Sequence, residues 1–389
     1  MQPDMPPKRI LHLHSSFSAG GKELRAVRLM NAFGAAFAHT VVSAQPGAHG
    51  AASVLDPALS VAFPSDFPSL QGRPTPLRLR RLAQAMRGFD LVLTYNWGAM
   101  DAVLAHRLYG AAMRLPPLVH HEDGFNEDEA QGLKWQRNLF RRVALGRAFA
   151  LVVPSRRLEG IAYEAWHQPR SRVRVIVNGI AIAAYRDAPP ADAIPGIAKA
   201  PGEKWLGTLA GLRAVKNLPR LVRAFANLPS EWRLVILGEG PERGAIEAQA
   251  KALGVEARVH LPGFVSDPSR AVGLFDLFAL SSDSEQFPIS VVEAMAAGLA
   301  VVSPAVGDVA EMVSVENRSY ITPPANEAAL AHALVRLAAD RTAREAIGKA
   351  NRALATAQYD ENAMISAYRE TYGQAMGDDG LFIAQPLQA

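Results

Sequence analysis

Segments with the pattern of buried β-strands alternate with helical segments along the whole chain, and this alternation restricts the possible folds more than any other feature of the sequence. In the first half we assign strands to residues 9–14, 90–95, 118–121, 149–153 and 174–177, and a helix to 22–33. In the second half we assign strands to residues 205–210, 233–237, 258–261, 274–280 and 299–303, with helices between them. Strands that alternate with helices build parallel sheets covered on both faces. The sequence therefore predicts an α/β protein with doubly wound sheets.

The length of the chain predicts two domains. With 389 residues it exceeds what one hydrophobic core usually supports, and its 49% hydrophobic and 20% charged residues are ordinary for a globular protein. The stretch 187–196 contains three prolines and interrupts the alternation. We expect a linker there, between two Rossmann-like domains.

Glu285 and Glu293 are the strongest candidates for a functional site. Glu285 follows the apolar run 274–280, and Glu293 stands eight positions later in an alanine-rich helix that ends before Gly298. A carboxylate after a strand and another on the next helix can both face the crevice in which open α/β sheets bind ligands. Spacing alone also allows two solvated charges, but the Phe-Pro before the helix and the second apolar strand after it favour a site.

This stretch resembles the signature of the retaining glycosyltransferases of family 4, in which a Glu, seven residues and a second Glu lead into a helix of small residues. The resemblance spans roughly residues 9–376 and is densest over 205–311. It implies the GT-B fold, two Rossmann-like domains that face a central cleft. The implied domains are an acceptor-binding domain, 1–185, joined by the helix 361–376, and a donor-binding domain, 186–360.

The second half carries residues suited to a nucleotide diphosphate sugar. Lys216 and Arg213 lie between a strand and a helix start, where cations neutralise charge on a departing diphosphate, although two surface cations would have the same pattern. The resemblance implies catalytic roles for Lys216, Arg213 and Glu285, and a ribose contact for Glu293. Relatives usually carry Gly-Arg at the site of 210–211, so the arginine is displaced here. The further donor-binding residues implied are Gly238, Phe264, Val265, Gln286, Phe287, Pro288, Ile289 and Ser290.

Two loops of the first half are further candidates. Gly20 and Gly21 stand between a strand and a helix, where backbone N–H groups suit a phosphate, and a plain turn is the alternative. The loop is not the G-x-G-x-x-G fingerprint, which argues against a nicotinamide enzyme. Many relatives carry a histidine before the glycine that is Gly124 here. That position is Asp123, so either Asp123 acts there or the role passes to His120 or His121; a histidine bonded only within the fold is the alternative.

The resemblance implies a retaining, metal-independent transfer of a hexosyl unit to a glycan or lipid-linked acceptor in cell-surface polysaccharide synthesis. The chain has no cysteines, so no cysteine-ligated metal is expected, and we expect no cofactor. No second carboxylate stands out as the nucleophile that double displacement needs. A non-catalytic GT-B protein that binds nucleotide sugars and a sugar-nucleotide epimerase are the alternatives.

The charge of the chain is concentrated in its first half. Residues 1–186 carry 23 Lys and Arg against 13 Asp and Glu, a net +10, whereas residues 187–389 carry 18 against 24, a net −6. No nucleic-acid-binding motif accompanies the arginines, so we expect no nucleic-acid partner. Cations beside apolar residues at helical spacing in 78–87 and 134–147 favour an anionic membrane surface, with a solvated helix face as the alternative. With no signal peptide or membrane span in the sequence, we expect a cytoplasmic protein, peripheral to the membrane.

Overall fold

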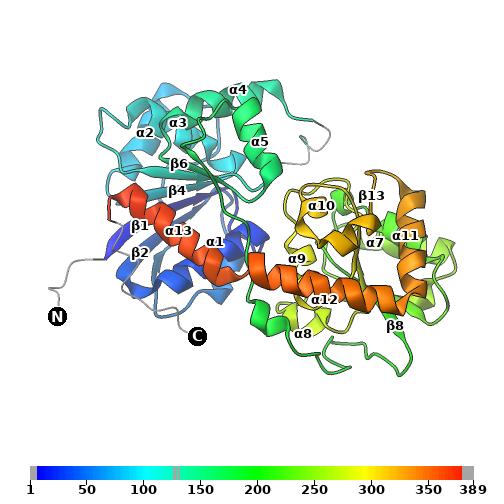
Figure 1. The fold of residues 1–389 in the computed structure, drawn as a ribbon. Helices are drawn as coiled ribbons and strands as arrows, with labels where there is room; N and C mark the ends of the chain where they lie inside the picture. The colour runs from blue at the N-terminus through cyan, green and yellow to red at the C-terminus, as the bar shows by residue number, and fades with distance from the viewer. Residues whose placement is uncertain (1–6, 126–128, 130–131, 379–389) are drawn as a thin grey trace. The chain divides into compact units, whose positions relative to one another are not determined.

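The computed structural model describes residues 7–125, 129 and 132–378, and the chain divides into two compact units. The N-terminal unit contains residues 1–177 and 364–389, and the C-terminal unit contains 178–363 (Figure 1). The division therefore lies at Val177 and Asn178, earlier than the expected boundary at 185. The proline-rich stretch 187–196 is part of the C-terminal unit, where Lys199, just after it, donates hydrogen bonds to Leu274 O and to Asp276 Oδ2, each at 2.7 Å.

The N-terminal unit is built on a seven-stranded parallel sheet in the order β3-β2-β1-β4-β5-β6-β7. Its strands are β1 (Lys8–His14), β2 (Phe37–Ser43), β3 (Ser60–Ala62), β4 (Leu91–Tyr95), β5 (Leu118–His121), β6 (Ala150–Val153) and β7 (Val173–Val175). Its helices are α1 (Gly21–Phe33), α2 (Pro76–Met86), α3 (Met100–Tyr109), α4 (Trp135–Ala144), α5 (Arg156–Glu164) and most of α13 (Glu361–Met376).

Alternating side chains of these strands enter two separate cores. Leu11 and Leu13 of β1 pack in the core covered by α2, α3 and α5, whereas Ile10 packs in the core covered by α1 and α13. This is the period-two alternation of a strand that is buried on both faces. Helix α13 crosses the sheet beside β1 and β2 in Figure 1, and its side chains Tyr368 and Tyr372 pack in the second of these cores.

The C-terminal unit repeats the architecture with six parallel strands in the order β10-β9-β8-β11-β12-β13. The strands are β8 (Lys204–Leu209), β9 (Trp232–Leu237), β10 (Val259–Gly263), β11 (Leu277–Ala279), β12 (Val301–Pro304) and β13 (Ile321–Thr322). The helices are α6 (Leu218–Phe225), α7 (Arg243–Ala252), α8 (Ser269–Val272), α9 (Ile289–Ala296), α10 (Val309–Met312), α11 (Glu327–Ala339) and α12 (Arg341–Gln358).

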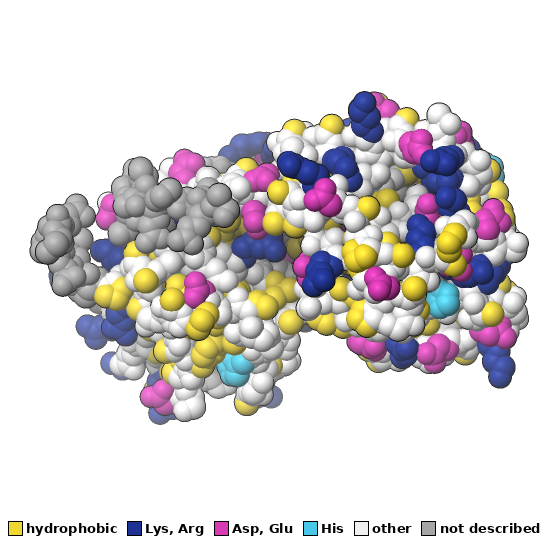
Figure 2. All heavy atoms as spheres, turned by 90° about the horizontal axis from the view of Figure 1, so that it is seen from below, with side chains coloured by type: hydrophobic (Ala, Val, Ile, Leu, Met, Phe, Trp, Pro, Cys, Tyr) yellow, Lys and Arg dark blue, Asp and Glu magenta, His cyan; other side chains and the backbone are white. Residues whose placement is uncertain are grey.

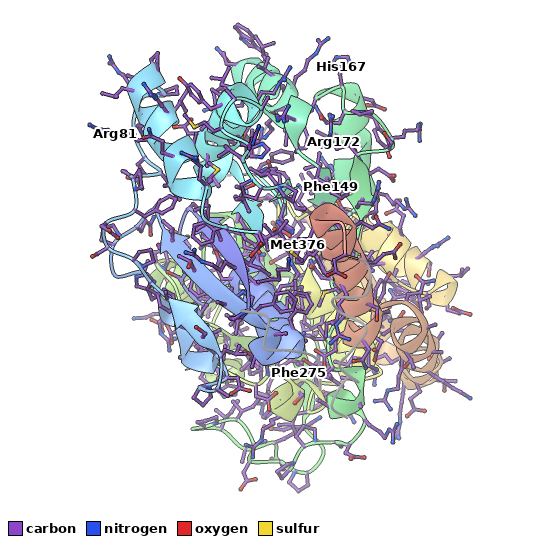
Figure 3. All side chains as sticks on the ribbon, turned by 90° about the vertical axis from the view of Figure 1, so that its left-hand side faces the viewer. Arg81, Phe149, His167, Arg172, Phe275 and Met376 are labelled. Atoms are coloured by element: carbon purple, nitrogen blue, oxygen red, sulfur yellow. The ribbon has the colours of Figure 1, made fainter. Side chains whose placement is uncertain are left out.

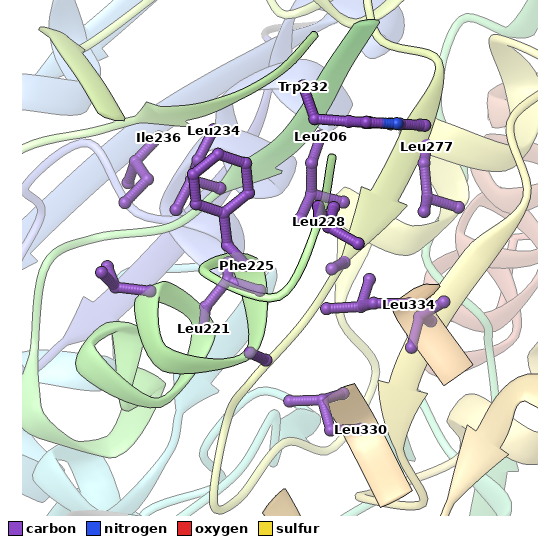
Figure 4. Close-up of a cluster of buried hydrophobic side chains, with 14 of the residues drawn as sticks. Leu206, Leu221, Phe225, Leu228, Trp232, Leu234, Ile236, Leu277, Leu330 and Leu334 are labelled. Carbon is purple, nitrogen blue, oxygen red and sulfur yellow. The ribbon is translucent and has the colours of Figure 1, made fainter. Parts of the chain in front are cut away.

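One face of this second sheet carries a core of large side chains. Phe225 at the end of α6 and Leu334 of α11 pack against Leu206, Ile236 and Leu277 of the strands (Figure 4). All five are fully buried. Burial of such side chains stabilises the fold by roughly 1.5–3 kcal/mol each.

The prediction of an α/β protein with two doubly wound Rossmann-like halves is confirmed. Three strands, β2, β3 and β13, were not predicted. The predicted strand 274–280 was too long, because its first residues form the turn after α8 and only Leu277–Ala279 pair with neighbouring strands.

Candidate active site

Lys216 and Glu285 form an ion pair at the point where the order of strands in the C-terminal sheet reverses. Lys216 ends a short 3-10 turn after β8, and Glu285 follows β11, which is the neighbour of β8. Lys216 Nζ donates to Glu285 Oε1 at 2.5 Å, and the two side chains are mostly buried. Ligands of open α/β sheets bind beyond the carboxyl ends of the strands at such a reversal.

Hydrogen bonds join the two loops that carry this pair. Ser282 Oγ donates to Glu285 Oε1 at 2.7 Å, and Ser281 Oγ donates to the Lys216 carbonyl at 2.9 Å. Asp283 N donates to Val215 O at 2.8 Å. The positions of the ammonium and the carboxylate are therefore fixed by backbone as well as by side chains, as a preorganised site requires.

Glu293 lies on α9, and the helix begins at Ile289, directly after Pro288. Tyr185 Oη donates to Glu293 Oε1 at 3.2 Å. A carboxylate has two oxygens that can accept hydrogen bonds from vicinal hydroxyl groups. The backbone N–H groups of Ile289 and Ser290 belong to the first turn of this helix, where the helix dipole favours negative charge.

The loop before α9 is held by the loop after β12. Asp308 N donates to Gln286 O at 3.0 Å. Gly307 has φ of 58°, and a Cβ there would lie 2.4 Å from Gln286 O and 2.8 Å from Glu285 O. Only glycine permits this approach, so Gly307 sets the position of the segment that carries Glu285, Gln286 and Phe287.

Three other predicted donor residues lie after neighbouring strands. Gly238 follows β9, and a Cβ there would be 1.9 Å from Ala210 O, so glycine is required by close packing. Phe264 follows β10 with 65% of its surface exposed, and Val265 beside it is half-buried. Arg213 is exposed before the turn that ends at Lys216.

In the N-terminal unit, Gly20 caps α1 and Gly21 is its first residue. Glu23 is buried in the first turn and pairs with Lys22, and its Oε2 would be 2.7 Å from a Cβ at Gly20. Burial raises the pKa of Glu23, and the neighbouring Lys22 opposes that change. The glycine pair and this carboxylate thus form one structural element at the carboxyl end of β1.

Asp123 is paired with Arg25 of α1. Arg25 Nη1 donates to Asp123 Oδ1, and Arg25 Nη2 donates to Asp123 Oδ2 at 2.9 Å. Asp123 N donates to Asn96 Oδ1 at 2.7 Å. Burial opposes the negative charge of Asp123, but Arg25 outweighs burial and lowers the pKa of the carboxyl group. Asp123 is therefore a fixed, ionised carboxylate.

His120 and His121 lie inside the fold. His121 Nδ1 is 3.2 Å from Thr94 O and its Nε2 is 2.8 Å from Tyr372 Oη, so both ring nitrogens have partners. Burial, assisted by Arg25, lowers the pKa of His121 to about 3. His120 Nδ1 is 2.8 Å from Thr94 Oγ1. Of the three alternatives for the histidine role, Asp123 is the one whose side chain retains exposure, at 13%.

Among the residues that contribute to these arrangements, sequence reasoning missed Arg25, Tyr185, Ser282 and Gly307. A glycine before a helix was the one local signal, at Gly307, because the other three act through tertiary contacts. Among the residues that the structure describes, no group of three or more His, Asp or Glu side chains is arranged to hold a metal ion.

The fold defines the class of the protein. The chain superposes on the Anabaena protein Alr3699/HepE, solved with UDP-glucose, with a TM-score of 0.76 at 21% identity over 94% of this chain and 99% of that one. Its two Rossmann-like units make it a GT-B protein.

The sequence comparisons give the family. The family model described as Glycosyltransferase Family 4 matches residues 19–184, and the model described as Glycosyl transferases group 1 matches 192–354. The chain therefore belongs to the GT-B glycosyltransferases of the family 4 type.

Two curated relatives agree with this assignment. The chain is 25% identical over 285 residues to N-acetyl-alpha-D-glucosaminyl L-malate synthase of Bacillus anthracis, covering 72% of this chain and 73% of the relative. It is 35% identical over 100 residues to the N-acetylgalactosamine-N,N'-diacetylbacillosaminyl-diphospho-undecaprenol 4-alpha-N-acetylgalactosaminyltransferase of Campylobacter jejuni, covering 26% of this chain and 27% of that enzyme.

Proposed function

We propose that the protein transfers a hexosyl unit, with retention of anomeric configuration, from a nucleoside diphosphate sugar to a glycan or lipid-linked acceptor. The observation that carries the proposal is the Lys216–Glu285 pair at the strand-order reversal, with Glu293 on the helix that follows. A cation and two carboxylates in this arrangement match the needs of a diphosphate, a sugar and a ribose. The UDP-glucose in the superposed Anabaena protein supports a uridine diphosphate sugar as the first donor to test.

In this proposal each residue has a distinct role. Glu293 accepts hydrogen bonds from the two ribose hydroxyls, and Lys216 and Arg213 neutralise the diphosphate. Displacement of Lys216 toward the phosphates releases Glu285 to accept hydrogen bonds from the donor hexose. Backbone groups of 286–290 orient the sugar and the diphosphate, and Phe264 offers an exposed ring to the base. In the N-terminal unit, Asp123 takes the role that relatives give to histidine.

The reaction proceeds on one face of the sugar. The bond between the anomeric carbon and the diphosphate oxygen breaks as the acceptor oxygen bonds to the same carbon from the same side. The acceptor proton passes to the leaving diphosphate, whose growing charge Lys216 and Arg213 stabilise. The proposed reaction uses no metal ion and no cofactor.

The names of two relatives bear on the acceptor. The Campylobacter relative is named for a diphospho-undecaprenol substrate, which supports a lipid-linked acceptor and a place in cell-surface polysaccharide synthesis. The Bacillus relative is named for L-malate, so a small hydroxy acid belongs in the acceptor panel. Among the described residues, no helix is both long and apolar enough to cross a membrane.

Helix α4 supports a peripheral position on an anionic membrane. Trp135, Leu139 and Val143 are exposed by 68%, 52% and 51%. They stand four residues apart on one stripe of the helix, which we call the α4 stripe. An exposed apolar stripe of this kind inserts readily into the interface between water and lipid.

The charges around the α4 stripe favour anionic lipid as its partner. Helices α2, α3 and α4 contain seven arginines and one acidic residue, Asp101. Arg80, Arg81, Arg107 and Arg142 are exposed, and Figure 3 shows Arg81 at the outer surface of α2. On the face of the C-terminal unit seen in Figure 2, by contrast, basic and acidic side chains are interspersed. Each cation near an anionic surface adds about 1 kcal/mol of attraction.

The central experiment is an assay over a panel of nucleotide sugars and acceptors. Release of nucleoside diphosphate is measured with UDP-, GDP- and dTDP-hexoses, alone and with malate, glycans or undecaprenyl-linked saccharides. The anomeric configuration of the product is then read by NMR. Retention supports the proposal and inversion contradicts it. Binding without any turnover would indicate a non-catalytic protein, and a changed sugar stereocentre on the intact donor would indicate an epimerase.

A further inference from the structure

Aromatic rings gather at the carboxyl ends of β1, β2 and β3, which are neighbours in the N-terminal sheet. His14 ends β1, Phe17 lies in the loop after it, His49 lies in the loop after β2, and Phe63 directly follows β3. The rings of His49 and Phe63 meet edge to face with 4.9 Å between centroids. Phe17 is 6.1 Å from Phe63 and 5.0 Å from His14. We call these four residues the aromatic corner.

The backbone of the aromatic corner is fixed by hydrogen bonds between its loops. Phe17 N donates to Ala48 O at 3.0 Å, and Ala51 N donates to Phe17 O at 3.0 Å. Ala44 N donates to His14 O at 2.9 Å. A ligand that binds there therefore meets a formed surface and does not have to order it, which lowers the entropic cost of binding.

The corner has a buried floor and an exposed ring beside hydroxyl groups. Phe17 and His14 are fully buried, whereas Phe63 is 37% exposed. Ser16 and Ser18 lie in the same loop as Phe17, with their hydroxyl oxygens 2.9 Å apart, and Ser18 is exposed. An aromatic face is electron-rich and packs against C–H groups, and hydroxyl groups orient a polar ligand. A pyranose ring offers both, because its C–H face is apolar and its rim carries hydroxyls.

Polar atoms without a hydrogen-bond partner lie in the aromatic corner. Among the described residues, His14 Nδ1, His14 Nε2 and His49 Nδ1 are buried with no hydrogen-bond partner. Leaving a buried polar group unpaired costs about 1–3 kcal/mol. Native proteins retain few such groups, and each of them requires an explanation such as strain, a catalytic role or a bound water or ion. Burial lowers the pKa of His14, so its ring is neutral, with one donor and one acceptor nitrogen.

We propose that the aromatic corner is a carbohydrate subsite that binds a pyranose ring of the acceptor, with Phe63 as its platform. The corner adjoins the strand-order reversal of its own sheet, because His14 stacks on Tyr95 of β4 with 3.9 Å between ring centroids. Ligand sites of open α/β sheets lie at that edge. The assignment of this pyranose to the acceptor rests on the proposed function. Binding of a sugar at Phe63 is testable without any transfer reaction.

The test is saturation-transfer NMR on the full chain with methyl α-glucoside, methyl α-galactoside and methyl N-acetylglucosaminide as probes, and with glycerol as a polyol that has no ring. We expect transfer to the ring C–H protons of at least one glycoside and none to glycerol. Phe63→Ala should weaken binding about tenfold, the loss expected for roughly 1.4 kcal/mol of aromatic contact, whereas Phe63→Tyr should retain it. The matched control is Leu77→Ala, because Leu77 lies in the same unit and its side chain is 62% exposed.

Two outcomes would overturn the subsite: no transfer to any glycoside with the wild-type chain, or equal transfer with wild type and Phe63→Ala. Thermal melting of each variant shows whether the unit has folded. A separate titration with UDP reports on nucleotide binding, in which Phe63 has no proposed role. If UDP binds and the glycosides do not, the subsite is wrong and the proposed function stands; the opposite result removes the nucleotide-sugar proposal and leaves a sugar-binding surface.

Discussion

Lys216 and Glu285 are 69 positions apart in the sequence, yet the lysine Nζ lies 2.5 Å from a carboxylate oxygen of the glutamate. Ser282 donates to the same oxygen, which therefore accepts two hydrogen bonds. A bound diphosphate would compete for the ammonium, and the sugar would compete for the carboxylate. The pair thus keeps both charged groups in position.

Replacement of Lys216 by Ala should lower turnover more than it weakens donor binding. The negative charge on the leaving diphosphate grows toward the transition state, where the ammonium stabilises it most. We expect a loss of about 100-fold in kcat, the size found when one charge-stabilising group is removed. Steady-state kinetics with varied donor measures both constants, with Lys251→Ala as an exposed lysine control. A rise in KM with kcat unchanged would show that Lys216 stabilises the bound donor and the transition state equally.

Glu293→Gln should weaken binding of nucleoside diphosphate by about 2 kcal/mol, because hydrogen bonds to a charged group are worth roughly 1.5–3 kcal/mol. Calorimetric titration with UDP measures the change. Glu345→Gln, at an exposed glutamate of the same unit, should bind as wild type. Unchanged affinity in Glu293→Gln would exclude the ribose contact.

Gly307→Ala should lower turnover on the order of tenfold, because the new methyl group would displace the backbone of Gln286 and Glu285 from the sugar position. Gly244 of α7 is the matched control, since a Cβ there meets nothing within 4 Å. Gly244→Ala should stabilise its helix by about 0.5–1 kcal/mol and leave turnover unchanged. Equal kinetics for the two variants would show that Gly307 does not position the loop.

The α4 stripe makes the membrane proposal testable. A Trp135→Ser, Leu139→Ser, Val143→Ser variant should lose co-sedimentation with anionic vesicles, and raising the salt concentration should weaken binding of the wild type. The control replaces Leu253, Val315 and Val335, three exposed apolar residues of the C-terminal unit, by Ser. Arg141 stays intact in every variant, because it is fully buried and paired with Glu122. Equal binding to neutral and anionic vesicles would reject anionic lipid as the partner.

Buried histidines should make the N-terminal unit sensitive to mild acid. Burial lowers the pKa of His39 to about 4 from an ordinary value of 6.5. The folded state therefore binds fewer protons than the unfolded state between these values, so stability is full above pH about 6.5 and falls as the pH decreases toward 4. The expected loss for one such group is on the order of 1 kcal/mol per pH unit.

Urea denaturation at pH 7.5 and pH 5 measures this loss. His39→Phe removes the titrating group and also the 3.0 Å contact with His12, so the variant should start less stable but depend less on pH. An identical pH dependence in wild type and variant would assign the effect to other groups.

The sequence predicted the two doubly wound halves because most strands are continuous apolar runs bounded by loops. The sequence did not predict β2, because His39, although buried, places a polar residue type among the apolar residues of this strand. The strand predicted over 274–280 was too long, because an apolar segment does not distinguish a buried turn from a strand. For the candidate site, the sequence motifs predicted individual residues. Their partners Arg25 and Tyr185 were not, because a buried arginine or a distant tyrosine has no local pattern.

Helix α13 also determines how the protein is assembled during synthesis. The C-terminal unit, 178–363, is one continuous segment, whereas the N-terminal unit needs residues from both sides of it. Tyr372 of α13 is hydrogen-bonded to His121 of β5, which lies 251 positions earlier in the sequence. During synthesis we therefore expect the second unit to be complete first, while the face of the first sheet that α1 and α13 share stays only partly covered until α13 emerges. A nascent chain arrested before residue 364 should expose that face to chaperones.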